Sequence, residues 1–257
     1  MTPSGIGPRA ALDLARHARG AASPKGPLLV TGVLAEALAR ELRAGGDASL
    51  VRTDGDPADA AAVVRVVAGG TTPEDERVLR AATRALVPTV VVQTGEPAAR
   101  IPYVLATDVV ECEPGKGFPV GEIVHALAAA LAQDGAALAA ALPVLREAVQ
   151  SRRIEDGAVA AGVLAVAGGG APRLPVLALA QARVLSDVAA AGGGARPEAP
   201  RAVAEAVVPP LAAALGTGFA ARALVRRLPL RNRLLDSAVA AAVTYALATA
   251  FRRFGRR

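Results

Sequence analysis

The sequence has very few aromatic residues. Phe, Tyr and Trp together make up 2% of the 257 residues, and tryptophan is absent. A buried core must therefore consist of alanine, valine and leucine, and the hydrophobic share of 53% is large enough to build one. The same scarcity argues against nucleic acid as a partner, because nucleic-acid-binding surfaces commonly offer aromatic rings on which bases stack.

Cysteine and histidine are almost missing as well. Cys112 is the only cysteine, so no intrachain disulfide can form and a cytoplasmic location is expected. Its neighbours Glu111 and Glu113 are expected to raise the thiol pKa, which disfavours a nucleophilic role. His17 and His125 are the only histidines, and neither has the spacing of a zinc site. No nucleophile elbow is present, so the sequence predicts no catalytic residue, no metal and no cofactor.

Lysine is scarce too, and the positive charge is concentrated at one end. Lys25 and Lys116 are the only lysines, although the formal net charge is +6. Residues 222–257 contain nine arginines and a single acid, Asp236, whereas the other 221 residues carry 20 basic and 22 acidic side chains. The nine are Arg222, Arg226, Arg227, Arg231, Arg233, Arg252, Arg253, Arg256 and Arg257.

These arginines lie on both sides of an apolar helical stretch expected at about 234–251. Basic clusters at both ends favour a helix lying on an anionic membrane surface over a single asymmetric span. The alternative is that the arginines solvate the ends of packed helices. Nucleic-acid binding is the least favoured interpretation, because no binding motif is present.

The first half of the chain has the pattern of an α/β domain, expected over residues 26–134. Apolar runs predict strands at 28–32, 60–68 and 88–92, one or two more within 101–112, and a possible short strand at 48–52. Helices are expected at 33–43, 72–86 and 121–133, the second opened by a capping box at Thr72-Pro73-Glu74-Asp75. Apolar strands separated by helices predict a three-layer, mostly parallel sheet.

The second half, residues 135–257, has no strand signal and predicts an all-α domain rich in alanine. Glycine and proline clusters divide it into helices at about 136–151, 155–167, 174–191, 198–225 (kinked at Pro209-Pro210) and 234–254. Its apolar stretches are shorter than the ~20 residues of a membrane span. We therefore favour packed or membrane-surface helices over insertion. Residues 1–25 are expected to form a loose arm with a short helix at 9–19 and no secretory signal.

The turn after the first strand is where a nucleotide-binding protein carries its phosphate-binding loop. In that loop, G-x-x-x-x-G-K-[ST], backbone amides and a lysine hold the phosphates. Here the turn at Thr31-Gly32 has one glycine and no lysine. Leu34, Ala35 and Glu36 stand where phosphate contacts are expected, and a carboxylate repels a phosphate. We therefore expect no nucleotide hydrolysis at this turn.

Three stretches carry a resemblance to a known arrangement. Residues 61–95 are similar to the third strand, helix and fourth strand of a small GTPase, and residues 107–131 to its last strand, loop and final helix. Residues 175–193 and 209–250 are similar to the Ala-rich helical domain found behind bacterial GTPase domains. That pattern comprises Gln181, Arg183, Gly218, Arg222, Thr244 and Tyr245. Over most of 28–251 the chain thus resembles the YcjF-like proteins.

The chain departs from this resemblance at each nucleotide motif. Gln93-Thr94-Gly95-Glu96 replaces the base-reading N-K-x-D, and Asp54-Gly55 stands near the magnesium motif with the wrong spacing. Lys116, between two glycines, could face an anion, although an ordinary loop is favoured. Asp54, Asp56 and Asp59 could hold Mg²⁺ or Ca²⁺, although a solvated turn is favoured. The resemblance then implies a degenerate site made of Thr31, Gly32, Asp54, Gly55, Gln93, Thr94 and Lys116.

The expected function is that of a non-catalytic pseudo-GTPase acting as an adaptor or scaffold. Its expected place is the cytoplasmic membrane face, peripheral or integral. The expected partners are another protein, such as an active GTPase or a second copy, and an anionic membrane surface. The alternatives are residual nucleotide binding at a non-standard site and an integral membrane protein of unknown function. An enzyme of unknown type is a third class, for which the sequence offers no acid–base or nucleophile constellation.

Overall fold

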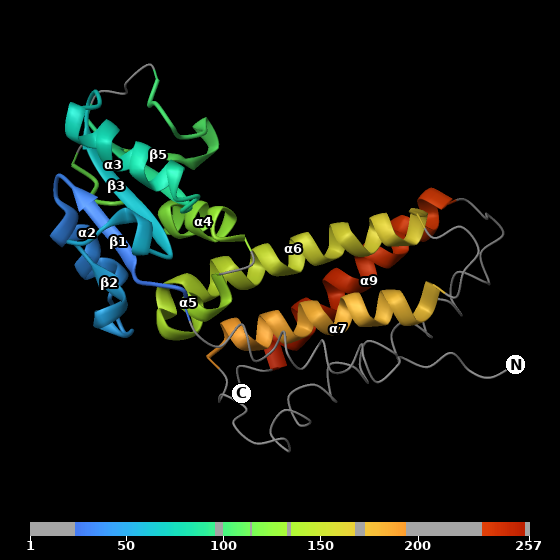
Figure 1. Cartoon of the computed structure of the whole chain (residues 1–257). Helices are drawn as coiled ribbons and strands as arrows, with labels where there is room; N and C mark the ends of the chain where they lie inside the picture. The colour runs from blue at the N-terminus through green and yellow to red at the C-terminus, as the bar shows by residue number, and fades with distance from the viewer. Residues whose placement is uncertain are drawn as a thin grey trace, which may run out of the picture. The chain divides into compact units, whose positions relative to one another are not determined.

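The computed structural model describes residues 24–95, 100–113, 115–132, 135–167, 173–193 and 233–254 (Figure 1). One compact unit comprises Ser23–Val149, and the described residues of the other begin at Gln150. The expected arm at 1–25, with its helix at 9–19, lies outside the described residues except at 24 and 25. The expected helix at 198–225 lies outside them entirely, as do Gly218 and Arg222.

The first unit contains a sheet of five parallel strands in the order β2-β1-β3-β4-β5. The strands are β1 (Leu28–Gly32), β2 (Val51–Arg52), β3 (Ala62–Ala68), β4 (Thr89–Thr94) and β5 (Val109–Cys112). This order is one of the two common doubly wound α/β arrangements. Every residue of β3 except Ala68 is buried, as expected for a central strand covered on both faces. The predicted parallel sheet is confirmed.

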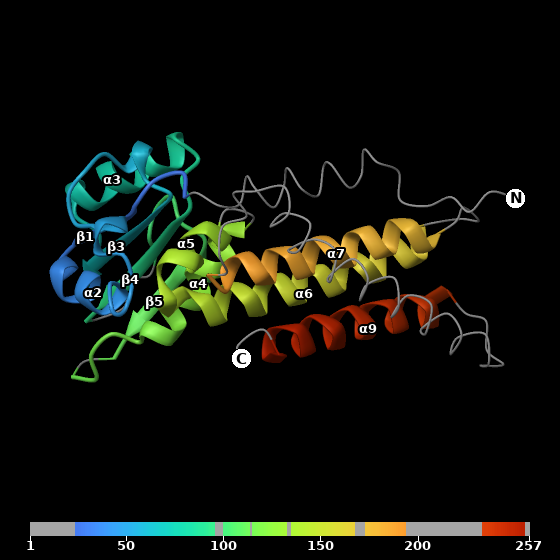
Figure 2. The ribbon, with the colours of Figure 1, turned by 90° about the horizontal axis from the view of Figure 1, so that it is seen from below.

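Helices cover both faces of this sheet. The three helices are α2 (Ala35–Leu42), α3 (Pro73–Arg84) and α4 (Val120–Ala130). On one face Ala82 of α3 packs with Leu29 and Val63. Figure 2 shows α2 on the opposite side of the sheet from α3. The expected three layers are therefore present, with the core formed by the aliphatic side chains of the strands and the buried faces of the helices.

The connection from β4 to β5 differs from the prediction. Strand structure begins only at Val109, so the strand expected from Ile101 onward is wrong before that residue. The described residues between the two strands contain no α-helix, only a 3-10 turn at Ala106–Asp108. Pro102 has no amide hydrogen for a ladder, and Tyr103 has a left-handed backbone with φ 67°. Ile101 nevertheless packs in the core with Val67, Leu79 and Val91.

Two further corrections concern short and long elements. The possible strand at 48–52 is a 3-10 turn at Ala48–Leu50, capped by the side chain of Asp47, and becomes a strand only at Val51. The break expected between residues 151 and 155 does not exist, because α6 runs unbroken over Pro143–Ala167. An ion pair between Arg152 and Asp156, 3.3 Å apart and one turn apart, supports the helix there.

The second unit is built from α6, α7 (Arg173–Ala191) and α9 (Arg233–Phe254), whose predicted positions at 174–191 and 234–254 are confirmed. A short helix, α5 (Gly135–Ala141), precedes α6 in the first unit. Gly157 lets α6 approach α7, because a Cβ there would lie 2.3 Å from the side chain of Val184. Among the helices that are described, none is long and apolar enough to cross a bilayer.

Candidate functional site at the carboxyl edge of the sheet

Doubly wound sheets bind ligands beyond the carboxyl ends of their strands, where the strand order reverses. In this sheet that point lies between β1 and β3. At this point β1 and β3 stay hydrogen-bonded to each other beyond the end of β1. The amide of Val33 donates to the carbonyl of Val66 at 3.1 Å, so the ladder continues past the end of β1. Gly32 has φ +101°, and a Cβ at this position would lie 2.0 Å from the same carbonyl oxygen.

The turn itself is too short to be a phosphate-binding loop. Only Val33 and Leu34 separate β1 from α2, whereas that loop has four residues between its glycines. If Gly32 is aligned with the first glycine, Leu38 falls at the lysine position. Leu38 is fully buried, so this position faces the core instead of a ligand. Leu34, the N-cap residue, has a left-handed backbone with φ 55° and makes no side-chain capping hydrogen bond.

Glu36 occupies the first turn of α2, where the helix dipole favours an anion. Thr53, just after β2, donates its hydroxyl to the Glu36 carboxylate at 2.6 Å, and Arg43 lies 3.4 Å from the other oxygen. The hydrogen bond from Thr53, assisted by the charge of Arg43, holds the pKa of Glu36 below its ordinary value. The protein's own carboxylate thus stands at the anion position.

The other residues implied by the resemblance serve the fold or lie apart. Gln93 donates its side-chain amide to the carbonyl of Gly69 at 3.1 Å, and Thr94 donates its hydroxyl to the carbonyl of Val67 at 3.1 Å. Thr31 has a buried hydroxyl with no partner among the described atoms. Asp54 and Gly55 follow β2, and Gly55 has a left-handed φ of +136°.

A metal site is not assembled around the acidic turn. Asp56 instead accepts a hydrogen bond from the amide of Ala58 at 2.9 Å and caps a 3-10 turn at Pro57–Asp59. No group of three His, Cys, Asp or Glu side chains that could hold a metal ion occurs within the described ranges. The carboxylates of Asp54, Asp56 and Asp59 are therefore not gathered as a ligand set.

A small hollow of about 190 Å³ lies beside the turn. Its lining consists of Leu34, Thr94, Gly95, Cys112, Glu113, Gly115, Gly117 and Phe118. The Cys112 thiol lies 3.0 Å from the carbonyl of Gly117 and donates to it. The described lining contains no cation, and Lys116 on the exposed loop beside it pairs with Glu113 at 2.5 Å. Of the seven implied residues, Thr94 lines the hollow and Lys116 stands beside it.

The thiol behaves as expected, for a different reason. Burial raises the pKa of Cys112, and the negative charge of Glu41 raises it further. Glu111 and Glu113, the immediate neighbours in the chain, are not the cause, so that part of the prediction is wrong. A neighbour in sequence on a strand points to the opposite face, which explains why a residue from α2 matters more.

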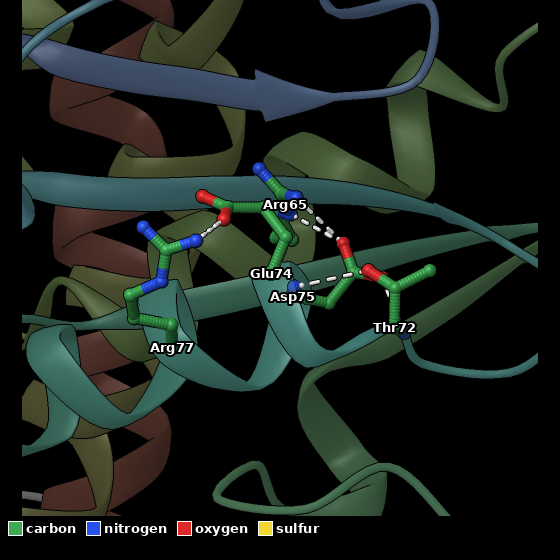
Figure 3. A network of polar contacts seen from close by, with 5 residues as sticks. All are labelled: Arg65, Thr72, Glu74, Asp75 and Arg77. Atoms are coloured by element: carbon green, nitrogen blue, oxygen red, sulfur yellow. Dashed lines mark hydrogen bonds and ion pairs between the residues drawn. The ribbon is translucent and has the colours of Figure 1, made fainter.

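The most extensively paired polar cluster lies at the start of α3 and was only half predicted (Figure 3). The capping box is confirmed: Asp75 accepts the amide of Thr72 at 2.7 Å, and its own amide donates to the Thr72 hydroxyl at 3.2 Å. The unexpected member is Arg65 from β3, which contacts the other oxygen of Asp75 through two nitrogens at 2.7 Å each. Both side chains are buried, at 9% and 7% exposed.

This network determines the ionisation of Asp75. Burial alone would raise its pKa, but the hydrogen bonds from Thr72 and the charge of Arg65 outweigh burial and lower the pKa below its ordinary value. The carboxylate also accepts the backbone amide of Thr72, the N-cap residue of α3. That helix start is therefore occupied by an internal anion, as the start of α2 is by Glu36.

The basic C-terminal residues are described only in part. Arg252 donates to the Ser151 hydroxyl at 2.8 Å, which ties α9 to α6, and Arg253 is exposed. Arg233 begins α9. The side chain of Arg233 and the whole of Arg222, Arg226, Arg227, Arg231, Arg256 and Arg257 lie outside the described residues.

Two polar residues of the helical pattern meet in the core of the second unit. Gln181 of α7 donates to the hydroxyl of Thr244 on α9 at 2.9 Å, and both side chains are buried. Thr244 in turn donates to the carbonyl of Ala240 at 2.8 Å. Tyr245, the next residue of the pattern, is half exposed instead.

Comparison with known proteins supplies no relative. The sequence matches no protein-family model, and neither a curated protein nor a solved structure is similar to it. A functional conclusion must therefore come from the chemistry of the residues described above.

Proposed function

We propose that the first unit is a non-catalytic adaptor module, a degenerate relative of small GTPases that binds no nucleotide. In this proposal the helical half provides the contact with a partner protein or with the anionic face of the cytoplasmic membrane. The observation that carries the proposal is Glu36, a carboxylate held by Thr53 at the helix start where a phosphate would bind.

Three features around Glu36 support the loss of nucleotide binding. The turn of Val33 and Leu34 has too few residues to surround a phosphate. The lysine position is a buried leucine, Leu38. The replacements for the base-reading motif donate their side chains to backbone carbonyls, Thr94 to Val67 in β3 and Gln93 to Gly69 just after it.

The adaptor role is further supported by what the first unit retains. A five-stranded sheet with both faces covered and a tightly paired buried network at the start of α3 is a stable framework. A framework of this kind, without a catalytic constellation, suits a protein that presents a surface. The sequence resemblance to the YcjF-like proteins, in which a helical domain follows such a framework, is consistent with this proposal.

Calorimetric titration with GTP, GDP and ATP, each with Mg²⁺, tests the absence of nucleotide binding. We expect no heat of binding for any of the three, because neither a loop nor a lysine is available to hold the phosphates. Binding in the micromolar range would contradict the proposal. Glu36→Gln is the matched variant and is also expected to give no heat of binding, since the turn remains too short after the charge is removed. Binding gained by this variant would favour residual nucleotide binding instead.

Flotation with vesicles containing anionic lipid tests the membrane contact of the helical half. We expect the full chain to float with these vesicles at low salt and to be released as the salt concentration rises, because arginine-lipid attraction is screened. Vesicles of neutral lipid are the control. Recovery in the unbound fraction at every salt concentration would remove membrane contact and leave a protein partner alone.

A further inference from the structure

We infer that the C-terminal end of α3 and the loop leading to β5 form a docking surface for an acidic protein segment that carries apolar side chains. The inference rests on the proposed adaptor role, which requires a partner-binding surface. This surface uses exposed residues of α3 and of the segment 100–105, none of which lines the hollow at the carboxyl edge.

The first reason is a leucine at a position that normally holds glycine. α3 ends in a left-handed residue, Leu86, with φ 58°. The amide of Leu86 donates to Thr83 at 3.1 Å, and that of Val87 to Ala82 at 2.9 Å, the pattern of a helix C-cap. Glycine is preferred there because a Cβ disfavours the left-handed conformation. Leu86 is also 89% exposed, so neither backbone geometry nor burial explains a leucine.

The second reason is Tyr103, which repeats the combination. Its backbone is also left-handed, with φ 67°, and its side chain is 46% exposed. Arg80 donates its Nε to the tyrosine hydroxyl at 3.0 Å, and its guanidinium lies 5.3 Å from the ring centroid. The Thr83 hydroxyl lies 3.4 Å from the carbonyl of Tyr103. These contacts hold the ring on the last turns of α3.

The third reason is the charge around these side chains. Leu105, two residues after Tyr103, is 70% exposed and adds a third large apolar group. Arg84 and Arg100 are exposed and make no hydrogen bond or ion pair with any described residue. Tyrosine and arginine are the residues enriched in interface hot spots, together with a depletion of lysine.

The charge selects the chemistry of the partner. Exposed arginines beside apolar side chains are complementary to a segment in which acidic residues flank leucine or an aromatic residue. Strained, exposed apolar side chains are costly to the isolated protein, and such costs concentrate at functional sites. The expected occupant is therefore an acidic, apolar segment of another protein.

Selection from a phage-displayed library of random peptides against the full chain tests the surface. We expect the enriched peptides to combine Asp or Glu with Leu, Phe or Trp. Their affinity is expected to fall about tenfold or more for Leu86→Gly, which removes an anchor, and for Arg84→Glu, which reverses a charge. Enriched peptides that lack acidic residues, or that bind both variants as tightly as the wild type, would overturn the proposal.

Thermal unfolding of Leu86→Gly separates binding from folding. If Leu86 serves the partner, glycine relieves the left-handed backbone and raises the unfolding midpoint by a few degrees while peptide binding is lost. Ala132→Gly, at a left-handed exposed alanine with φ 39°, is the matched control: the midpoint rises and binding is kept. A lower midpoint for Leu86→Gly would show that the leucine stabilises the fold and would overturn the proposal.

Two further measurements complete the test. A concentration-dependent dimer of the full chain that Leu86→Gly disrupts would assign the surface to a second copy and overturn the acidic partner. Nucleotide titration is independent of this surface, so a positive titration with normal peptide selection would remove the adaptor role and leave the docking surface intact.

Discussion

Two of the helices that begin at the carboxyl edge of the sheet, α2 and α3, start in opposite ways. α3 begins with a complete capping box joined to a buried arginine, while α2 begins at a left-handed leucine with no side-chain cap. Both follow a strand of the same sheet, so position alone does not explain the contrast. The stabilising contacts are concentrated at the start of α3, and the start of α2, where a nucleotide site would be, is left with a strained turn and an internal carboxylate.

Substitution of Asp75, at the well-capped start of α3, should lower the stability of the protein the most. Asp75→Ala removes the one ion-pair partner that the buried Arg65 guanidinium has among the described residues and leaves a buried charge without compensation. Loss of one member of such a pair costs about 3–5 kcal/mol. Urea denaturation should show a midpoint lowered accordingly with an unchanged slope. The double variant Arg65→Met with Asp75→Ala is the control and should recover much of the loss; an equal loss in both would contradict the pairing argument.

Lowering the pH should remove the folding stability that the ionised Asp75 carboxylate contributes. The pKa of Asp75 is lower in the folded protein than in the unfolded chain, where it is about 4. The unfolded state therefore takes up the proton first as the pH falls, and stability declines from about pH 4 downward through the folded pKa. Thermal unfolding between pH 5 and pH 2 should show this decline. Asp75→Ala should flatten it, and an identical slope in both proteins would contradict the assignment.

How far the sequence predicts this edge depends on how local each signal is. The capping box was predictable because Thr72 and Asp75 are three residues apart and their pattern has a mechanical meaning. Arg65 was not predicted as its partner, because an arginine within a run of valines only signals a polar interruption. Its partner is fixed by the packing of α3 on β3, ten residues away in the chain.

The same distinction explains the other successes and failures. Strands 28–32 and 62–68 are apolar runs and were predicted nearly to the residue. The prediction of a strand directly after Ile101 is wrong, because the sequence does not show that Tyr103 adopts a left-handed backbone conformation. Cys112 contacts Gly117 and is affected by the charge of Glu41 because of how the loop and α2 are placed in the fold. The sequence therefore predicts a raised thiol pKa but not the residues that raise it.

Thr72 offers a smaller perturbation of the stable helix start. Thr72→Ala removes the hydroxyl that accepts from the Asp75 amide and donates to its carboxylate at 2.6 Å. Loss of an N-cap typically costs about 1 kcal/mol. Thermal unfolding should register a decrease smaller than that of Asp75→Ala. Thr72→Ser, which keeps the hydroxyl, should restore stability, and a serine variant as weak as the alanine one would argue against the cap.

A substitution at the strained start of α2 should raise the stability instead of lowering it, and by the smallest amount of these changes. Leu34→Gly removes a side chain that is 64% exposed and relieves a left-handed backbone at φ 55°. The gain should be below the roughly 1 kcal/mol expected for a left-handed residue, because glycine also gains freedom in the unfolded chain. A small rise of the unfolding midpoint is the expected result. A fall would show that Leu34 contributes contacts that its exposure does not reveal.

The closeness of Gly32 to β3 has a consequence for sequence variation among homologues. The 2.0 Å approach of a would-be Cβ to the Val66 carbonyl allows only glycine at this position, whatever the protein binds. A glycine retained at this turn is therefore accounted for by strand packing and is not a record of past phosphate binding. Homologues should keep this glycine even as the residues after it vary, and a motif search that scores the glycine alone would not separate this packing role from phosphate binding.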